Sequence, residues 1–228
     1  MRFDVSMLPD VSGLLVGIIG GTGDQGRGLA MRLASTGQRI LIGSRTSERA
    51  ASAAKEVAAI AGGSIEGDTN FDVASRSDLV IVSVPYEGHA DTLAALREPL
   101  AGKIVVDCVN PLGFDKQGPF VLAVPEGSAA EQAASILPDS RVCAAFHHVS
   151  ADLLTDPSVE QMDLDVLVLG DDRDAVRVVQ ALASRISGMR GVHAGRLRNA
   201  AQVEALTANL ISINKRYGSH AGIRVTDL

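Results

Sequence analysis

Tryptophan is absent from this 228-residue chain, and aromatic residues make up only 3% of it. With so few large rings, the core must be built from Ala, Val, Leu and Ile, which allow backbone elements to pack closely. Such a core is typical of a parallel sheet covered by helices. With 46% hydrophobic and 21% charged residues, the composition is that of a globular chain that can bury a sizeable core.

Positive charge and cysteine are also scarce. With a net charge of −6, the chain lacks the excess of basic residues that binding to nucleic acid or to an acidic membrane requires. No apolar run is long enough to span a membrane, and residues 1–12 lack the basic flank and apolar core of a signal peptide. Cys108 and Cys143 lie in apolar tracts without metal-ligand spacing. We therefore predict buried reduced thiols, no metal site, no nucleic-acid or membrane partner, and a cytoplasmic location.

Glycine, in contrast, is concentrated after the first apolar segment, 16–19. Gly21, Gly23 and Gly26 fit the pattern G-x-G-x-x-G, and an apparently helical stretch follows to about Ser35. The pattern alone is weak, but the order strand, glycine turn and helix forms a phosphate cradle. Glycines let the backbone approach a pyrophosphate, and the positive end of the helix faces the anion. The segment therefore predicts a dinucleotide-binding βαβ unit.

The end of the second predicted strand, 40–43, indicates which dinucleotide is bound. An NAD-binding protein usually offers a carboxylate there to the ribose, whereas this chain offers Ser44 and Arg45, with Arg49 one turn into the next helix. A hydroxyl and two guanidinium groups suit the 2′-phosphate of NADP. The alternative is that both arginines are solvated charges at a helix start, where cations are mildly unfavourable.

The remaining pattern alternates between helices and strands. We expect strands at 64–66, 78–84, 103–107 and 142–146, helices at 48–61, 70–75, 89–96 and 128–137, and a loop at 110–113. Beyond these come a strand at 165–169, a helix at 174–186, a strand at 191–193 and a helix at 199–217. We predict an α/β fold, a Rossmann-type parallel sheet with helices on both faces plus a small C-terminal α/β domain. The predicted parts are an N-terminal extension at 1–12, an NADP-binding Rossmann domain at 13–148, and a C-terminal domain at 149–228 that completes a crevice for a second ligand.

Several segments, in this order, resemble one family. They are residues 20–30, 42–45, 84–86 and 169–172, together with Asn199 and 203–207 in the last predicted helix. The chain is similar, over nearly its whole length after Ser12, to NADP reductases that depend on coenzyme F-420 (F420), also called F420H2:NADP oxidoreductases. The resemblance implies reversible hydride transfer between C4 of the nicotinamide and C5 of an 8-hydroxy-5-deazaflavin. It also implies NADP(H) in the Rossmann half, F420 as co-substrate in the crevice, and a homodimer.

The resemblance also implies the site residues. The cofactor-binding positions are Gly21, Thr22, Gly23, Asp24, Gln25 and Gly26 at the phosphates, Ser44, Arg45 and Arg49 at the 2′-phosphate, Ser83, Val84 and Pro85 beside the nicotinamide, and Val109, Asn110, Pro111, His147, His148, Val149 and Ser150 beside the deazaflavin. Arg49 stands where relatives carry Lys, and Tyr86 replaces a Trp. Candidate contacts for the anionic F420 tail are Arg196, Arg198, Lys215 and Arg216, each of which also fits a solvated surface charge.

Both coenzymes are organic hydride carriers, so the protein needs only to stack the reacting carbons, and we predict no obligatory catalytic acid or base. Such positioning can contribute roughly 7–11 kcal/mol in favourable intramolecular cases. His147 and His148 can tune the reaction by donating to the deazaflavin ring, although neighbours on a strand point to opposite faces. His89, at a helix start near the nicotinamide, is expected at the surface, with contact to the nicotinamide as the alternative.

Other functions stay open at this point. An NADPH-dependent reductase of an imine, ketone or flavin is one, but it needs a proton donor, and the last predicted helix carries Lys215 only near its end. A non-catalytic NADP-binding sensor is another, and it would need no second coenzyme. The sequence does not set the physiological direction of transfer or the preferred length of the F420 tail.

Overall fold

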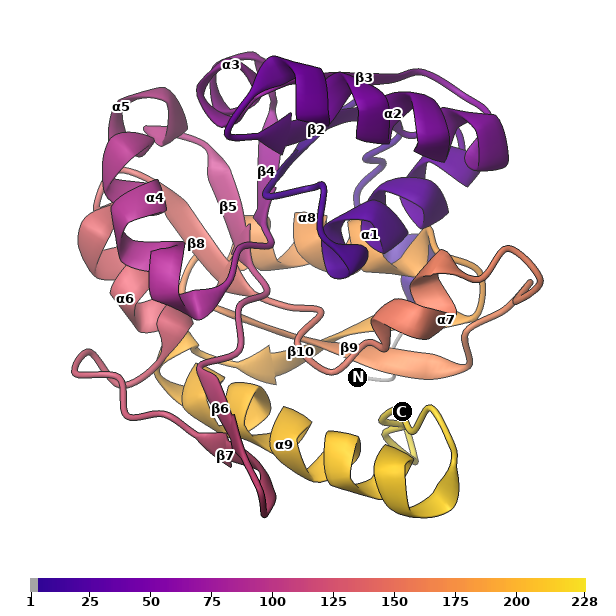
Figure 1. The fold of residues 1–228 in the computed structure, drawn as a ribbon, viewed down its shortest axis with the longest axis vertical. Coiled ribbons are helices and arrows are strands. Elements are labelled where there is room, and N and C mark those ends of the chain that lie inside the picture. Colours follow the sequence, from indigo (N-terminus) through magenta and orange to yellow (C-terminus); the bar gives the residue numbers. More distant parts are fainter. Residues whose placement is uncertain (1–3) are drawn as a thin grey trace.

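The computed structural model describes residues 4–228, and an eight-stranded sheet runs through it (Figure 1). All neighbouring strands in this sheet pair in parallel except β8 and β9, so β9 and β10 run opposite to the other six. In sheet order the strands are β10 (Met189–Gly195), β9 (Leu164–Gly170), β8 (Arg141–Ala144), β5 (Ile104–Asp107), β4 (Leu79–Val82), β1 (Leu15–Ile19), β2 (Arg39–Ser44) and β3 (Ile65–Thr69).

Helices cover both faces of the sheet, which confirms the predicted fold class. They are α1 (Asp24–Ser35), α2 (Ser47–Ala61), α3 (Asn70–Arg76), α4 (His89–Ala95), α5 (Arg97–Leu100), α6 (Ala129–Ile136), α7 (Ala151–Thr155), α8 (Arg173–Ser184) and α9 (Ala200–Tyr217). Three short 3-10 helices are η1 (Val5–Met7), η2 (Tyr86–Gly88) and η3 (Leu197–Asn199). The first three residues of the predicted extension lie outside the described residues.

Strand side chains alternate between two buried clusters, one on each face. Ile18 and Ile81 join the cluster under α1, α2 and α8, whereas Ile19 and Val82 join the cluster under α3 to α6. All four side chains are fully buried, and each contributes about 1.5–3 kcal/mol relative to exposure. Because the central strands are apolar on both faces, they need helices on both sides.

The glycine turn between β1 and α1 has little room for side chains. Gly20 has φ +71°, and a Cβ there would lie 2.5 Å from the carbonyl oxygen of Ser83. A Cβ at Gly26 would lie 2.6 Å from the Cα of Gly21. The backbone N–H of Gly21 donates to the carbonyl of Gly43 at 3.0 Å, so the turn is held against the end of β2.

The structure differs from the expected elements after β5 and after β8. The expected loop at 110–113 is confirmed only for residues 110 and 111, because residues 112–121 form a hairpin of β6 (Leu112–Asp115) and β7 (Gly118–Val121). Pro119 lies inside β7, and because proline is uncommon in sheets, the sequence did not indicate a strand here. The strand expected to run to residue 146 ends at Ala144, and Phe146 takes a left-handed φ of 65° that turns the chain away.

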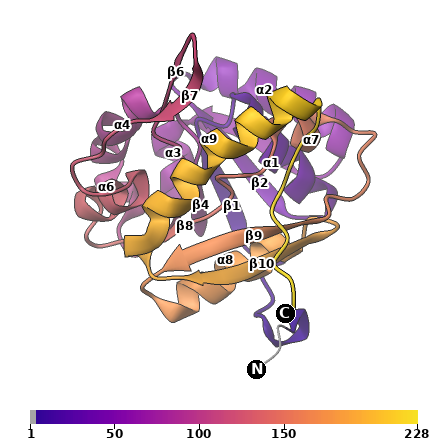
Figure 2. The ribbon, with the colours of Figure 1, turned by 90° about the horizontal axis from the view of Figure 1, so that it is seen from below.

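The sheet continues across the expected domain boundary at residue 148. Cys143 and Ala144 of β8 pair with Gly170 and Leu169 of β9. The division into two domains at residue 148 stays a prediction, and the two parts share one sheet. Seen from below, α9 crosses the molecule diagonally, and the segment after it turns back and passes across β9 and β10 (Figure 2). This return is fixed by the N–H of Asp165, which donates to the carbonyl of Ile223 at 2.7 Å.

Candidate active site

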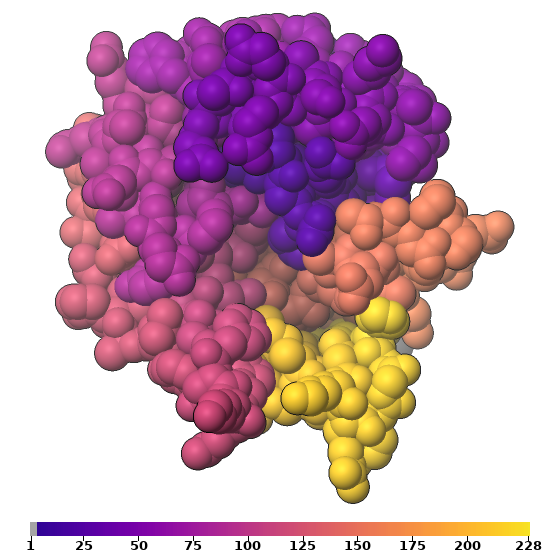
Figure 3. Space-filling model, viewed as in Figure 1, coloured from indigo at the N-terminus to yellow at the C-terminus, as the bar shows by residue number. Residues whose placement is uncertain are grey.

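Two cavities meet at the carboxyl ends of β1, β4 and β5. The larger has a volume of about 560 Å³ and the smaller about 390 Å³, and both are lined by Gly23, Ser83, Val84 and Pro85. They therefore form one groove. The space-filling view shows its hollow between the glycine turn in indigo, the α7 region in orange and α9 in yellow (Figure 3). Ligands of open α/β sheets bind at this edge.

The smaller cavity gathers most of the residues predicted to bind NADP. Its lining consists of Gly20, Thr22, Gly23, Ser44, Arg45, Arg49, Asn70, Ser83, Val84, Pro85, Gly88 and Thr92. No carboxylate is in this set of described residues. Gly21 and Gly26 are buried instead and shape the turn behind it. Sequence reasoning missed Asn70, whose Oδ1 accepts from the N–H of Gly20 at 3.3 Å, although its place directly after β3 follows the same strand-end rule.

The charges and donors of this cavity fit a phosphorylated dinucleotide. Within residues 4–228, neither exposed guanidinium, Arg45 or Arg49, has a carboxylate partner within ion-pair distance. Ser44, the last residue of β2, is almost fully buried. Helix α1 starts at the N-cap Gly23, and no described side chain caps it. Its first N–H groups are thus left for an anion.

The larger cavity, called the cleft below, gathers most of the residues predicted for the deazaflavin. Its lining is Gly23, Asp24, Gln25, Ser83, Val84, Pro85, Cys108, Val109, Asn110, His147, His148, Val149, Ser150, Ala151, Asp152, Thr207, Leu210, Ile211, Asn214 and Ala221. Pro111 is not brought to the cleft: it is buried, and its carbonyl accepts from the N–H of Leu122. Cys108 and Cys143 are buried, free thiols, and burial raises the pKa of each to about 12.

Both histidines expected at the cleft are there. The expectation that they point to opposite faces of a strand is wrong, because β8 ends at Ala144 and the turn at Phe146 brings both to the cleft. Burial lowers the pKa of His147 to about 4 and also lowers the pKa of His148, so both rings are neutral at neutral pH. Nε2 of His148 is 2.7 Å from the carbonyl oxygen of Asp165, whereas neither ring nitrogen of His147 has a partner among the described residues.

Helix α9 supplies a wall that sequence reasoning did not assign to the site. Thr207, Leu210, Ile211 and Asn214 line the cleft. Their spacing of three, four and seven residues places them on one helix face, and this spacing is visible in the sequence alone. The hydroxyl of Thr207 donates to the carbonyl of His147 at 3.0 Å, so the helix also fixes the histidine backbone.

Behind the cleft lies a buried polar cluster. The expected surface position of His89 is wrong: its side chain is fully buried, with Nε2 2.6 Å from Oδ2 of Asp107 and Nδ1 2.9 Å from Gln132. Burial opposes charge on His89, but the hydrogen bond and charge of Asp107 outweigh it and raise the pKa of the ring. The other oxygen of Asp107 accepts from the N–H of Val109 at 3.0 Å, so this pair holds the cleft-lining loop from behind.

Glu204 of α9 is buried beside this cluster. Its carboxyl accepts from the N–H groups of Ala129 and Ala130, at 2.9 and 3.1 Å, and so occupies the N-terminus of α6. Burial raises its pKa to about 7, although both backbone hydrogen bonds favour the anion. Glu204 therefore joins α9 to α6 and does not face the cleft.

The arginines and lysine considered for the F420 tail do not line the cleft. Arg196, Arg198, Lys215 and Arg216 are all exposed, and Arg196 lies 3.6 Å from Asp171. Within residues 4–228, no three His, Cys, Asp or Glu side chains are grouped so that they could share a metal ion. The same part of the chain contains no helix with the length and apolar character needed to cross a membrane.

Comparisons with known proteins agree with this geometry. Residues 15–111 match the family model described as NADP oxidoreductase coenzyme F420-dependent. The F420-dependent NADP reductase of Methanothermobacter thermautotrophicus is 43% identical over 93% of this chain and 95% of its own length. That of Methanocaldococcus jannaschii is 41% identical over 93% of this chain and 98% of its own.

A solved structure extends the likeness to three dimensions. The crystal structure of a putative F420-dependent NADP reductase from Arthrobacter sp. FB24 superimposes with a TM-score of 0.78 at 26% identity, covering 94% of this chain and all of that one. The chain therefore belongs to the family of F420-dependent NADP reductases.

Proposed function

We propose that this protein transfers a hydride reversibly between NADP(H) and the 8-hydroxy-5-deazaflavin coenzyme F420. One observation carries the proposal: a cavity with two exposed guanidinium groups and a cleft with neutral histidines are both lined by Ser83, Val84 and Pro85. Two ligands that fill these spaces therefore meet beside these three residues. The relatives, F420-dependent NADP reductases, indicate the chemical identity of both ligands.

The NADP(H) half rests on the smaller cavity. The uncapped N-terminus of α1 would hold the pyrophosphate, while Ser44, Arg45 and Arg49 would hold the 2′-phosphate. A planar guanidinium can bind two phosphate oxygens at once, which makes two arginines a strong discriminator against NADH. Val84 and Pro85 would then lie beside the nicotinamide, at the junction with the cleft.

The F420 half rests on the cleft. Val109, Val149, Leu210 and Ile211 give it apolar surfaces that suit a planar ring and keep water out. When bound, the two coenzymes supply the hydride chemistry themselves, so the chain has to bind and align them. His147 is neutral, but both of its ring nitrogens are buried, so its side chain would have to turn into the cleft to donate to the ring. His148 already uses Nε2 on the Asp165 carbonyl.

The assembly and the location belong to the same proposal. Exposed apolar side chains occur on the β6–β7 hairpin, which packs through β7 on α9, and on α9 itself; these are Phe114, Phe120, Val121, Ile213 and Tyr217. We assign this patch to the contact between two copies of a homodimer. The free buried thiols fit the reducing cytoplasm. The part from 149 onward acts as the C-terminal domain that completes the cleft.

The activity can be tested by following the visible absorbance of oxidised F420 after the purified protein is mixed with NADPH or NADH. Rapid bleaching with NADPH and little with NADH is expected, because only NADPH carries the 2′-phosphate. If NADPH binds tightly and F420 is not bleached, the protein is another reductase or an NADP sensor.

A further inference from the structure

Residues 218–225, called the strap below, lie at the far end of the cleft. The strap begins at Gly218, whose left-handed backbone ends α9 and turns the chain back. Ala221 lines the cleft, and its N–H donates to Oδ1 of Asn214, which lines the cleft from α9, at 2.6 Å. On the opposite lip, Nδ1 of His220 lies 3.3 Å from Oγ of Ser150. The strap thus joins the two lips of the cleft.

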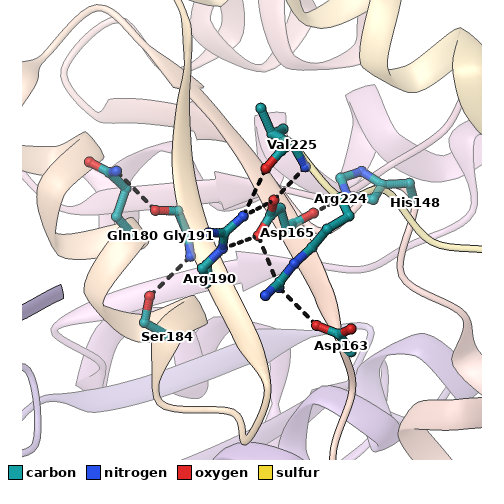
Figure 4. A network of polar contacts seen from close by, with 9 residues as sticks. All are labelled: His148, Asp163, Asp165, Gln180, Ser184, Arg190, Gly191, Arg224 and Val225. Atoms are coloured by element: carbon teal, nitrogen blue, oxygen red, sulfur yellow. Dashed lines mark hydrogen bonds and ion pairs between the residues drawn. The ribbon is translucent and has the colours of Figure 1, made fainter. Parts of the chain in front are cut away.

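One buried residue, Asp165 of β9, anchors the strap (Figure 4). Its carboxylate accepts from the N–H of Val225 at 2.7 Å and lies 3.3 Å from the guanidinium of Arg224. Its own N–H donates to the carbonyl of Ile223 at 2.7 Å. Three successive strap residues therefore contact a single aspartate.

The same aspartate contacts the cleft. Its carbonyl lies 2.7 Å from Nε2 of His148, so a neutral His148 carries its proton on Nε2 and donates it to Asp165. The position of a cleft-lining ring and the position of the strap are therefore set by one residue.

Arg190 of β10 keeps Asp165 charged in this buried place. Its guanidinium binds both carboxylate oxygens, at 2.6 and 2.7 Å, and also donates to the carbonyl of Val225 at 3.0 Å. Burial opposes charge on Asp165, but the hydrogen bonds from Arg190 and Val225 outweigh it and lower the pKa of the carboxyl. Asp165 is thus a preformed anionic anchor with several partners.

We propose that the strap is the outer wall of the F420 site and that Asp165 is its positioning residue. The inference rests on the proposed function, because it assigns the cleft to F420. No strap residue lines the smaller cavity. The strap and Asp165 therefore determine the affinity for F420 and leave that for NADPH unchanged.

Asp165→Asn keeps the size of the side chain but removes its charge, and the matched control is Asp174→Asn. Asp174 is an exposed aspartate in the first turn of α8, outside the strap and outside the lining of the cleft. With a loosened strap, F420 must order the segment when it binds, which opposes binding. We expect Asp165→Asn to raise KM for F420 about tenfold, with KM for NADPH within about twofold of wild type and the control unchanged.

Two further variants separate a wall from a general loss of structure. Ala221→Phe leaves the anchor intact and should weaken F420 binding by filling the cleft. A variant that stops at Gly218 removes the wall altogether and should have the same selective effect. Calorimetric titration with oxidised F420 and with NADP measures both affinities without turnover. Hydrogen exchange should show a faster Val225 amide in Asp165→Asn.

The outcomes distinguish this inference from the proposed function. If the wild-type protein does not reduce F420, the function itself is wrong. If it does, and Ala221→Phe and the shortened variant bind F420 as well as wild type does, the strap is not a wall of the site. Equal losses of F420 and NADPH binding in Asp165→Asn would show that Asp165 only stabilises the fold.

Discussion

Replacing Arg45 and Arg49 together with alanine removes both guanidinium groups from the smaller cavity. Both side chains are exposed, and the double variant leaves Ser44, at the end of β2, in the lining of the cavity. A hydrogen bond to a charged group contributes about 1.5–3 kcal/mol, and solvent exposure places each arginine at the lower end of this range. Two contributions of about 1.5 kcal/mol correspond to roughly a hundredfold change in affinity. We therefore expect KM for NADPH to rise about a hundredfold.

The assay compares three constants: KM for NADPH, for NADH and for F420. KM for NADH should hardly change because NADH has no 2′-phosphate, so the preference for NADPH should nearly disappear. The effect of salt on KM for NADPH should also weaken, because exposed charge pairs are screened within about 10 Å at 0.1 M salt. Arg39→Ala is the matched control, since Arg39 is an exposed arginine at the opposite end of β2. An equal rise in the constants for NADPH and F420, or a preserved preference for NADPH, would refute the assignment of the 2′-phosphate site.

Three other perturbations test the cleft and the cluster behind it. Ser150→Leu should raise KM for F420 at least about tenfold with little change for NADPH; unchanged F420 kinetics would place the deazaflavin elsewhere. His89→Ala should lower the unfolding free energy in urea by about 3–5 kcal/mol, because it leaves Asp107 as a buried unpaired charge; a loss under about 1 kcal/mol would mean that the pair behaves like an exposed one. Glu204 has a folded pKa of about 7 against an ordinary 4.5, so between these pH values the folded state holds the extra proton and stability falls as pH rises. Glu204→Gln should reduce this fall by up to about 3 kcal/mol. The fall is obtained from the unfolding free energy in urea, measured at a series of pH values for both proteins. An equal dependence on pH in the two proteins would contradict the prediction.

The gathering of Thr22, Gly23, Ser44, Arg45 and Arg49 at one cavity could be predicted from the sequence because its signals are local. The glycine turn, the helix after it and the end of β2 lie within about one βαβ unit, and each has a direct physical reason. The parallel sheet then brings the strand ends together without further information. Asn70 follows the same rule at the end of β3 and could have been included.

The rest of the site depended on contacts between distant residues. The burial of His89 requires Asp107, eighteen residues away, and nothing in a histidine at a helix start reveals that partner. The backbone of Phe146 is left-handed, a conformation that a bulky residue rarely adopts, so a strand prediction ran through it. The face of α9 with Thr207 and Asn214 was visible in the spacing, but only the fold shows that this face closes the cleft.

The reversal of direction between β8 and β9 explains why the second half of the site can exist at all. The carboxyl ends of the parallel strands supply loops and the first turns of the helices after them to the groove. Because β9 runs antiparallel to β8, with Cys143 opposite Gly170, its amino end and that of β10 lie toward the same edge. This brings Asp165 and Arg190, near the starts of their strands, next to His148. A parallel continuation would have placed these charges at the opposite edge of the sheet, with no anchor for the strap beside the cleft.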